Sequence, residues 1–78
     1  MKTEYDDVRF EQDNIGKSWD CWLVDAETCI GYVVLNQLTG DWEFEFNLFN
    51  GDNVSLTQQD FLDIAHFLGQ LKGGKEGA

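Results

Sequence analysis

Few side chains in this sequence could take part in catalysis or bind a metal, and their spacing keeps them apart. They are one histidine, His66, and two cysteines, Cys21 and Cys29. A zinc site needs Cys and His side chains at ligand spacing, and the chain contains neither a CxxC nor an HxxxH motif. Acyl transfer needs a nucleophile, a base and an orienting acid, and the predicted sheet places His66 next to neither cysteine. We therefore expect no catalytic residue, no bound metal, no cofactor and no enzymatic activity.

Carboxylates are the abundant reactive groups, and their distribution is one-sided. The chain carries 15 Asp and Glu against 5 Lys and Arg, a formal net charge of −10. From Ser18 to Leu71 there is no Lys or Arg at all. Such a field repels the phosphates of DNA and RNA and favours fast, salt-sensitive association with a basic protein surface. The alternative interpretation is that the acidity serves solubility alone.

Length and composition predict one small folded domain. The 78 residues leave little room for a buried active site, and six Phe, three Trp and two Tyr are too many for a disordered acidic chain. The first twenty residues lack the apolar run of a secretion signal, and no segment reaches the roughly 18 apolar residues that span a bilayer. We expect a cytoplasmic protein with two free thiols and no contact with membranes.

Four segments rich in aromatic and β-branched residues precede one segment with helical spacing. The predicted strands cover residues 5–12, 17–25, 28–37 and 41–49. This pattern predicts an α+β fold, a four-stranded antiparallel β-meander with one C-terminal helix packed on one face (ββββα, two-layer). The domain covers residues 1–72, and a disordered Gly-rich tail covers residues 73–78.

The start of the helix is the best specified local feature. Thr57 is a good N-cap, and Asp60 three residues later occupies the capping-box position. The helix is predicted to end near Lys72, or one turn earlier at Gly69. The apolar positions that repeat at helical spacing, and are expected to face the sheet, are Phe61, Ile64, Ala65, Leu68 and Leu71.

The last strand alternates cleanly and sets the register. Trp42, Phe44 and Phe46 lie on one side and Glu43 and Glu45 on the other, so the aromatic side must face the core. Connections of four, two and three residues between successive strands extend this face across the sheet. The predicted core residues of the other strands are Val8, Phe10, Trp19, Cys21, Leu23, Ile30, Tyr32 and Val34.

The same register leaves an apolar strip on the opposite face, which no second helix covers. The strip consists of Trp22, Val24, Cys29, Gly31, Val33 and Leu35. An apolar centre with an acidic rim is typical of a protein interface. In the alternative, Trp22 lies flat over Gly31 and Val33 and shields them with no partner. The predicted partner-binding residues are Asp7, Asp20, Trp22, Val33, Leu35, Glu43 and Glu45.

In size, single-domain build and charge, residues 1–72 are similar to the small acidic inhibitors that bacteriophages make against host defence systems, anti-CRISPR proteins among them, some of which mimic DNA. The resemblance implies an inhibitor or modulator that occupies a basic, nucleic-acid-binding surface of its target in the host cytoplasm. One alternative is a homodimeric structural or accessory protein whose exposed sheet face is a self-association seam, with Arg9 paired across to Asp20 or Glu11. Another is an accessory domain that binds a small ligand between helix and sheet.

Overall fold

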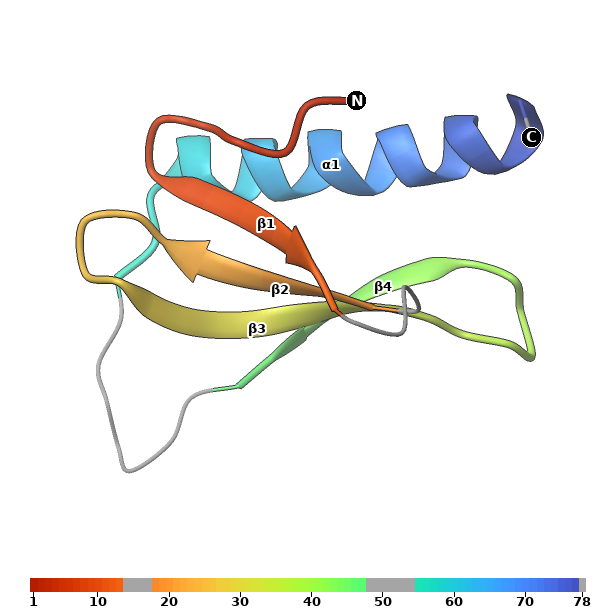
Figure 1. Ribbon diagram of the computed structural model, residues 1–78, viewed down its shortest axis with the longest axis horizontal. Helices are drawn as coiled ribbons and strands as arrows, with labels where there is room; N and C mark the ends of the chain where they lie inside the picture. The colour runs from red at the N-terminus through yellow and green to blue at the C-terminus, as the bar shows by residue number, and fades with distance from the viewer. Residues whose placement is uncertain (14–17, 48–54, 78) are drawn as a thin grey trace.

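The computed structural model describes residues 1–13, 18–47 and 55–77, with side chains described as far as Lys72. Its elements are β1 (Val8–Gln12), β2 (Ser18–Leu23), β3 (Thr28–Leu35), β4 (Trp42–Phe46) and α1 (Gln58–Gly77). The strands form one antiparallel sheet in the order β1-β2-β3-β4, and α1 lies across one face of it (Figure 1). The predicted ββββα architecture is therefore confirmed. No helix in these ranges is long and apolar enough to cross a membrane.

The hydrophobic core fills the space between α1 and the sheet. Its buried members are Tyr5, Val8, Phe10, Cys21, Ile30, Val33, Ile64 and Phe67. Phe67 is fully buried at the centre, where it packs against Phe10 and meets the edge of Trp19, whose ring centroid is 5.1 Å away. The core therefore joins β1, β2 and β3 to one stripe of the helix.

The buried stripe of α1 matches the prediction for Ile64, Leu68 and Leu71, which lie in or against the core, and differs at two positions. Ile64 and Phe67 face the sheet, whereas Phe61 is 51% exposed and Ala65 is also exposed. The apolar residues of the helix are compatible with two overlapping stripes at helical spacing. Packing of the Phe67 ring against β1 and β2 selects the stripe that contains it, which turns Phe61 and Ala65 away from the core.

Both ends of α1 can be explained locally. At its start the capping box is confirmed: the Asp60 backbone N–H donates to Thr57 Oγ1 (3.2 Å), and the Thr57 backbone N–H donates to Asp60 Oδ2 (2.9 Å). At its end the helix extends beyond Lys72, where its end was expected, to Gly77. Glycine lowers helix propensity but, unlike proline, keeps the backbone hydrogen bond.

The connection between β3 and β4 has four residues, 37–40, and not the predicted three. The Asn36 backbone N–H donates to the Asp41 carbonyl (2.8 Å), and the Gly40 N–H donates to the Asn36 carbonyl (2.7 Å). Gly40 adopts a φ of 80°, which glycine reaches without strain. The longer loop shifts the register by one residue, and a one-residue shift turns a strand over.

β3 is consequently inverted relative to the prediction over most of its length. Val33 pairs with Phe44 on the core face and is fully buried. Tyr32 and Val34, predicted to be core residues, pair with Glu45 and Glu43 on the opposite face. β4 itself has the predicted orientation over its described residues.

A β-bulge in β3 changes which side chains face the core between the start of the strand and its end. Cys21 pairs with Gly31, but the next residue of β2, Trp22, pairs with Cys29, so Ile30 is an extra residue between the two pairs. This β-bulge lets Ile30 and Gly31 both lie on the buried side. The prediction for Ile30 is thus confirmed. Cys21 is buried and Cys29 lies on the other face, and both are free thiols.

The remaining connections change the pairing without turning a strand over. Phe10 pairs with Cys21, two residues from the predicted partner Trp19, so β1 keeps its predicted faces. β2 and β3 are joined through residues 24–27, because Leu23 pairs with Thr28. The turn between β1 and β2 and the end of the predicted fourth strand lie outside the described residues.

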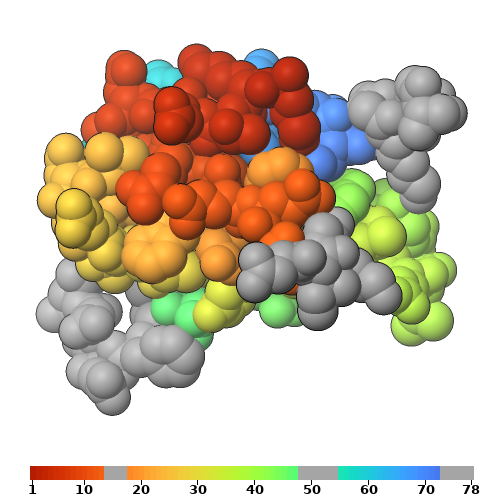
Figure 2. Space-filling view, viewed as in Figure 1, coloured from red at the N-terminus to blue at the C-terminus, as the bar shows by residue number. Residues whose placement is uncertain are grey.

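The N-terminal segment is tied to α1. The Lys2 backbone N–H donates to Gln70 Oε1 (2.7 Å), and Gln70 Nε2 donates to the Lys2 carbonyl (2.8 Å). The Tyr5 hydroxyl lies 2.8 Å from His66 Nδ1, within hydrogen-bonding distance. In Figure 2 the red atoms of this segment lie beside the blue atoms of the helix. The contacts place the first residues on the helix side of the sheet.

Candidate protein-binding face

The sheet face that α1 does not cover is called here the outer face. Strand alternation and the pairing register assign to it Arg9, Glu11, Asp20, Trp22, Cys29, Tyr32, Val34, Glu43 and Glu45. It contains side chains from all four strands, and in Figure 1 no helix lies against it. Four of its nine members are carboxylates, which makes it acidic.

One row across the outer face carries most of this charge. Glu11 of β1 pairs with Asp20 of β2, Asp20 pairs with Tyr32 of β3, and Tyr32 pairs with Glu45 of β4. Paired residues have Cβ atoms roughly 4.5–5.5 Å apart. Two like charges therefore lie directly opposite each other, an arrangement that destabilises the isolated sheet. Below we call these four residues the acidic row.

A second row carries an aromatic ring and Arg9, the one cation among the nine described residues assigned to the outer face. The Arg9 guanidinium lies over the Trp22 ring, 5.4 Å from its centroid, and Arg9 Nε is 3.5 Å from Glu11 Oε1. The Trp22 Nε1 atom is buried and has no hydrogen-bond partner among the described residues. Trp22 pairs with Cys29 on its other side. The predicted packing of Trp22 on Gly31 and Val33 is wrong, because those residues face the core.

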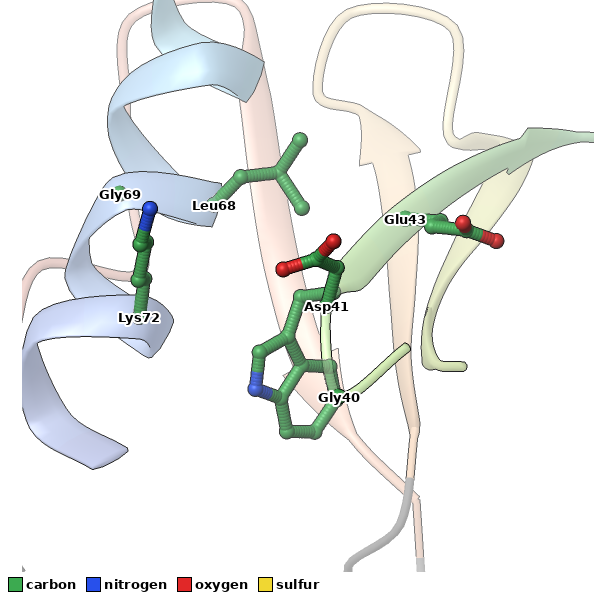
Figure 3. Close-up of a pocket in the computed structure, with 7 residues that line it drawn as sticks. Gly40, Asp41, Glu43, Leu68, Gly69 and Lys72 are labelled. Carbon is green, nitrogen blue, oxygen red and sulfur yellow. The ribbon is translucent and has the colours of Figure 1, made fainter. Parts of the chain in front are cut away.

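The structure brings together four of the seven predicted partner-binding residues. Asp20, Trp22, Glu43 and Glu45 all lie on the outer face. The Glu43 carboxylate accepts a hydrogen bond from Asn36 Nδ2 (3.2 Å), and in Figure 3 it points away from the helix. Asp20 and Glu45 belong to the acidic row, and Trp22 and Glu43 lie in the rows on either side of it.

The other three predicted residues lie elsewhere. Val33 is a core residue with no exposed surface, so it cannot contact a partner. Leu35 lies on the core side of β3, opposite Trp42 and 37% exposed at the end of the strand. Asp7 precedes β1 and lines a separate pocket near the start of α1. The positions of Val33 and Leu35 both follow from the one-residue register shift between β3 and β4.

Tyr32 and Val34 are the outer-face residues that the sequence interpretation missed. The Tyr32 hydroxyl accepts a hydrogen bond from Asn47 Nδ2 at 2.6 Å. The signal that could have found them is Asn36, since Asn side chains initiate turns by accepting hydrogen bonds from the following backbone. Asn36 Oδ1 accepts from the backbone N–H groups of Leu38 (2.9 Å) and Thr39 (3.3 Å).

A groove of about 500 Å³ lies between α1 and β4 (Figure 3). Its lining residues are Gly40, Asp41, Trp42, Glu43, Leu68, Gly69 and Lys72. In Figure 3 the Asp41 carboxylate is directed toward the helix and Leu68 points into the gap. A side chain built at Gly69 would meet nothing within 4 Å. Among the pockets lined by described residues, this groove is the one between helix and sheet where a small ligand would fit.

The thiols are poorly suited to nucleophilic chemistry. Burial, with smaller contributions from Cys29 and Asp60, raises the pKa of Cys21 to about 12. Burial also raises the pKa of Cys29. A nucleophilic cysteine needs a lowered pKa, so neither thiol is activated. Among the described residues no group of three or more His, Cys, Asp or Glu side chains could hold a metal ion.

Neither a protein-family model nor a curated protein nor a solved structure matches this chain in sequence or fold.

Proposed function

We propose that this protein is a small inhibitor or modulator that binds a basic protein surface through its outer face. The observation that carries the proposal is the acidic row of Glu11, Asp20, Tyr32 and Glu45, which runs across all four strands. Its target is of the nucleic-acid-binding kind, because carboxylates on this face can take the places of phosphates. The resemblance in size, single-domain build and charge to phage inhibitors of host defence systems supports a target of that class.

The arrangement of charge supports binding over solubility alone. Solubility is served by charges of both signs distributed over a surface. Here Glu11 and Asp20 lie directly opposite each other, which costs stability in the free protein. A basic partner would remove that repulsion on binding. Along β4, Glu43 and Glu45 recur about every 7 Å, so the carboxylates form a two-dimensional array.

Aromatic and aliphatic side chains complete the outer face. Trp22 is half-buried under Arg9, and Tyr32 and Val34 are partly exposed in the neighbouring strand. Trp and Tyr are enriched among residues that contribute most to binding energy. We propose that these side chains make the apolar contacts with the partner. The carboxylates then determine the rate of association and the choice of partner.

The test is capture of partners from bacterial lysate on the immobilised protein at low and high salt, with duplex DNA as competitor. We expect a nucleic-acid-binding enzyme or complex that is retained at low salt and released by salt and by DNA. The double variant Glu43→Lys, Glu45→Lys should weaken its binding at least about tenfold. The matched control Glu27→Lys, Asp41→Lys changes the net charge equally at exposed positions outside the outer face, and should retain the partner.

Two results would contradict the proposal. The first is equal capture by the outer-face double variant and its control. The second is a mass that rises with protein concentration and returns to the monomer in the outer-face variant, which would favour the homodimer. Arg9 already contacts Glu11 and Trp22 of its own chain, and this argues against its predicted pairing across a two-fold axis.

A further inference from the structure

A second acidic feature lies at the start of α1, away from the outer face. It is a pocket of about 280 Å³, which we call the acidic socket. Its lining residues are Asp7, Leu23, Asp25, Ala26, Ser55, Thr57 and Asp60. Three carboxylates thus converge from the segment before β1, the β2–β3 connection and the first turn of the helix.

Asp60 is the unusual member of the socket. It is only 3% exposed, and its Oδ2 atom accepts the capping hydrogen bond from the Thr57 backbone. Its Oδ1 atom is buried and has no hydrogen-bond partner among the described residues. A buried carboxylate oxygen without a donor is costly, so such groups in folded proteins are normally satisfied by a protein group, water or an ion. When Asp7 is ionised, Asp60 therefore lacks a donor among the described residues.

The carboxylates beside Asp60 increase the need for a positively charged donor in the socket. The pKa of Asp7 is raised, because its protonated form can hydrogen bond to the Asp60 carboxyl and because burial and the charges of Asp60, Asp25 and Asp6 disfavour its ionised form. Two of the cations in the described ranges are engaged elsewhere. Lys2 lies over the Tyr5 ring and Arg9 over the Trp22 ring.

We propose that the acidic socket binds the guanidinium group of an arginine side chain contributed by the partner protein. A guanidinium is weakly hydrated and presents five N–H donors in a planar fork, which suits carboxylates on several walls. Leu23 and Ala26 supply an apolar wall for the aliphatic stem of that side chain. A metal ion fits less well, because the described carboxylates are not grouped as metal ligands. Only the assignment of the arginine to a partner rests on the proposed function.

Methylguanidinium provides a direct probe of the socket, with methylammonium at the same ionic strength as the comparison. Titration of ¹⁵N-labelled protein, followed by amide chemical shifts, should give saturable changes at Asp7, Ala26, Thr57 and Asp60. Asp7→Asn and Asp25→Asn should each weaken binding by about tenfold or more, since each removes one charged hydrogen-bond acceptor. Asp63→Asn, in the same helix but outside the socket, is the matched control and should bind as the original chain does.

Several outcomes would overturn the assignment. Shift changes spread over all exposed carboxylates, or equal affinity in Asp7→Asn, would show that the socket holds only water or a proton shared between carboxyl groups. Tighter binding of methylammonium would exclude guanidinium as the preferred ligand. The result is separable from the proposed function. If the socket binds methylguanidinium, its assignment holds even when the outer-face variant captures partners normally. If the outer-face variant loses its partner, the proposed function holds even when the socket binds no methylguanidinium.

Discussion

Phe10 of β1 and Phe67 of α1 stack face to face, with ring centroids 3.9 Å apart and planes inclined by 1°. The pair links the two layers of the domain through their side chains. The Tyr5 ring meets Phe10 edge-on at 5.9 Å, and the Trp19 ring meets Phe67 edge-on. A single aromatic cluster thus joins the N-terminal segment, two strands and the helix.

We expect Phe67→Ala to lower the free energy of unfolding by about 3–5 kcal/mol, the usual loss for a large buried aromatic side chain. The control is Phe61→Ala, which removes the same group from a position that is 51% exposed and should change stability by no more than about 1 kcal/mol. Urea denaturation followed by circular dichroism measures both values. Equal losses would mean that the helix presents the other stripe to the sheet.

Gly31 should not tolerate a side chain. A Cβ atom at this position would lie 2.7 Å from the Phe44 ring and against the Glu45 carbonyl oxygen, closer than real Cβ atoms approach. We expect Gly31→Ala to lower the free energy of unfolding by at least about 1–3 kcal/mol, as overpacking does. A thermal denaturation curve unchanged from that of the original chain would contradict the β3–β4 register.

Gly69 should behave in the opposite way. It lies within α1, and an added Cβ would meet nothing within 4 Å. Alanine is favoured over glycine in a helix by about 0.8–1.0 kcal/mol, so Gly69→Ala is expected to raise the midpoint of thermal unfolding. The variant Gly69→Leu should also fold, and its leucine side chain would occupy the groove beside Trp42. Destabilisation by alanine would show that the helix packs more closely here than described.

Cys29 should react with iodoacetamide before Cys21 in the folded protein. Cys21 is fully buried, and its pKa of about 12 leaves almost no thiolate at pH 8, whereas Cys29 is partly exposed on the outer face. Peptide mapping of the alkylated protein over time distinguishes the two sites. Because folding favours the protonated thiol of Cys21, stability should also fall as the pH rises above the ordinary thiol pKa toward 12. Equal alkylation rates in native buffer would contradict the burial of Cys21.

Asp7→Asn is expected to stabilise the free protein at neutral pH. The pKa of Asp7 is raised in the folded state, so its contribution to stability is present below the ordinary value of 3.8 and is lost as the pH rises through the raised one. The uncharged asparagine avoids that loss, and its advantage should shrink as the pH falls below 3.8. Denaturation midpoints measured across this range test the expectation. A variant less stable than the original chain at pH 7 would show that the Asp7 carboxylate is compensated.

Local signals were sufficient to predict the elements of this fold. The turn residues between apolar segments separate the strands, and Thr57 with Asp60 marks the start of the helix. Strict alternation in β4 identifies its core face and predicts Glu43 and Glu45 on the outer side, where the structure has them. Each of these features depends on residues close together in the sequence.

Alternation alone does not predict which side chains of β3 face the core. The extra residue Ile30 and the four-residue loop after Asn36 each shift the pairing, and Val33 ends in the core while Val34 faces out. A glycine inside a strand is a known sign of a bulge, so Gly31 is the signal for the extra residue, as Asn36 is for the longer loop. The acidic socket could not be predicted, because Asp7 and Asp60 meet only when the sheet and helix pack together.

Among the described strands β4 lies at an edge of the sheet and pairs only with β3. Phe46 on this strand is 54% exposed, and a free edge with exposed aromatic side chains is a template for addition of further strands. A second copy paired there would place its own carboxylates next to Glu43 and Glu45, and the repulsion opposes polymerisation into fibrils. The same two side chains would then serve recognition and protect the chain from amyloid-like growth. A substitution that removed these two charges would therefore weaken recognition and also leave the β4 edge open to strand addition.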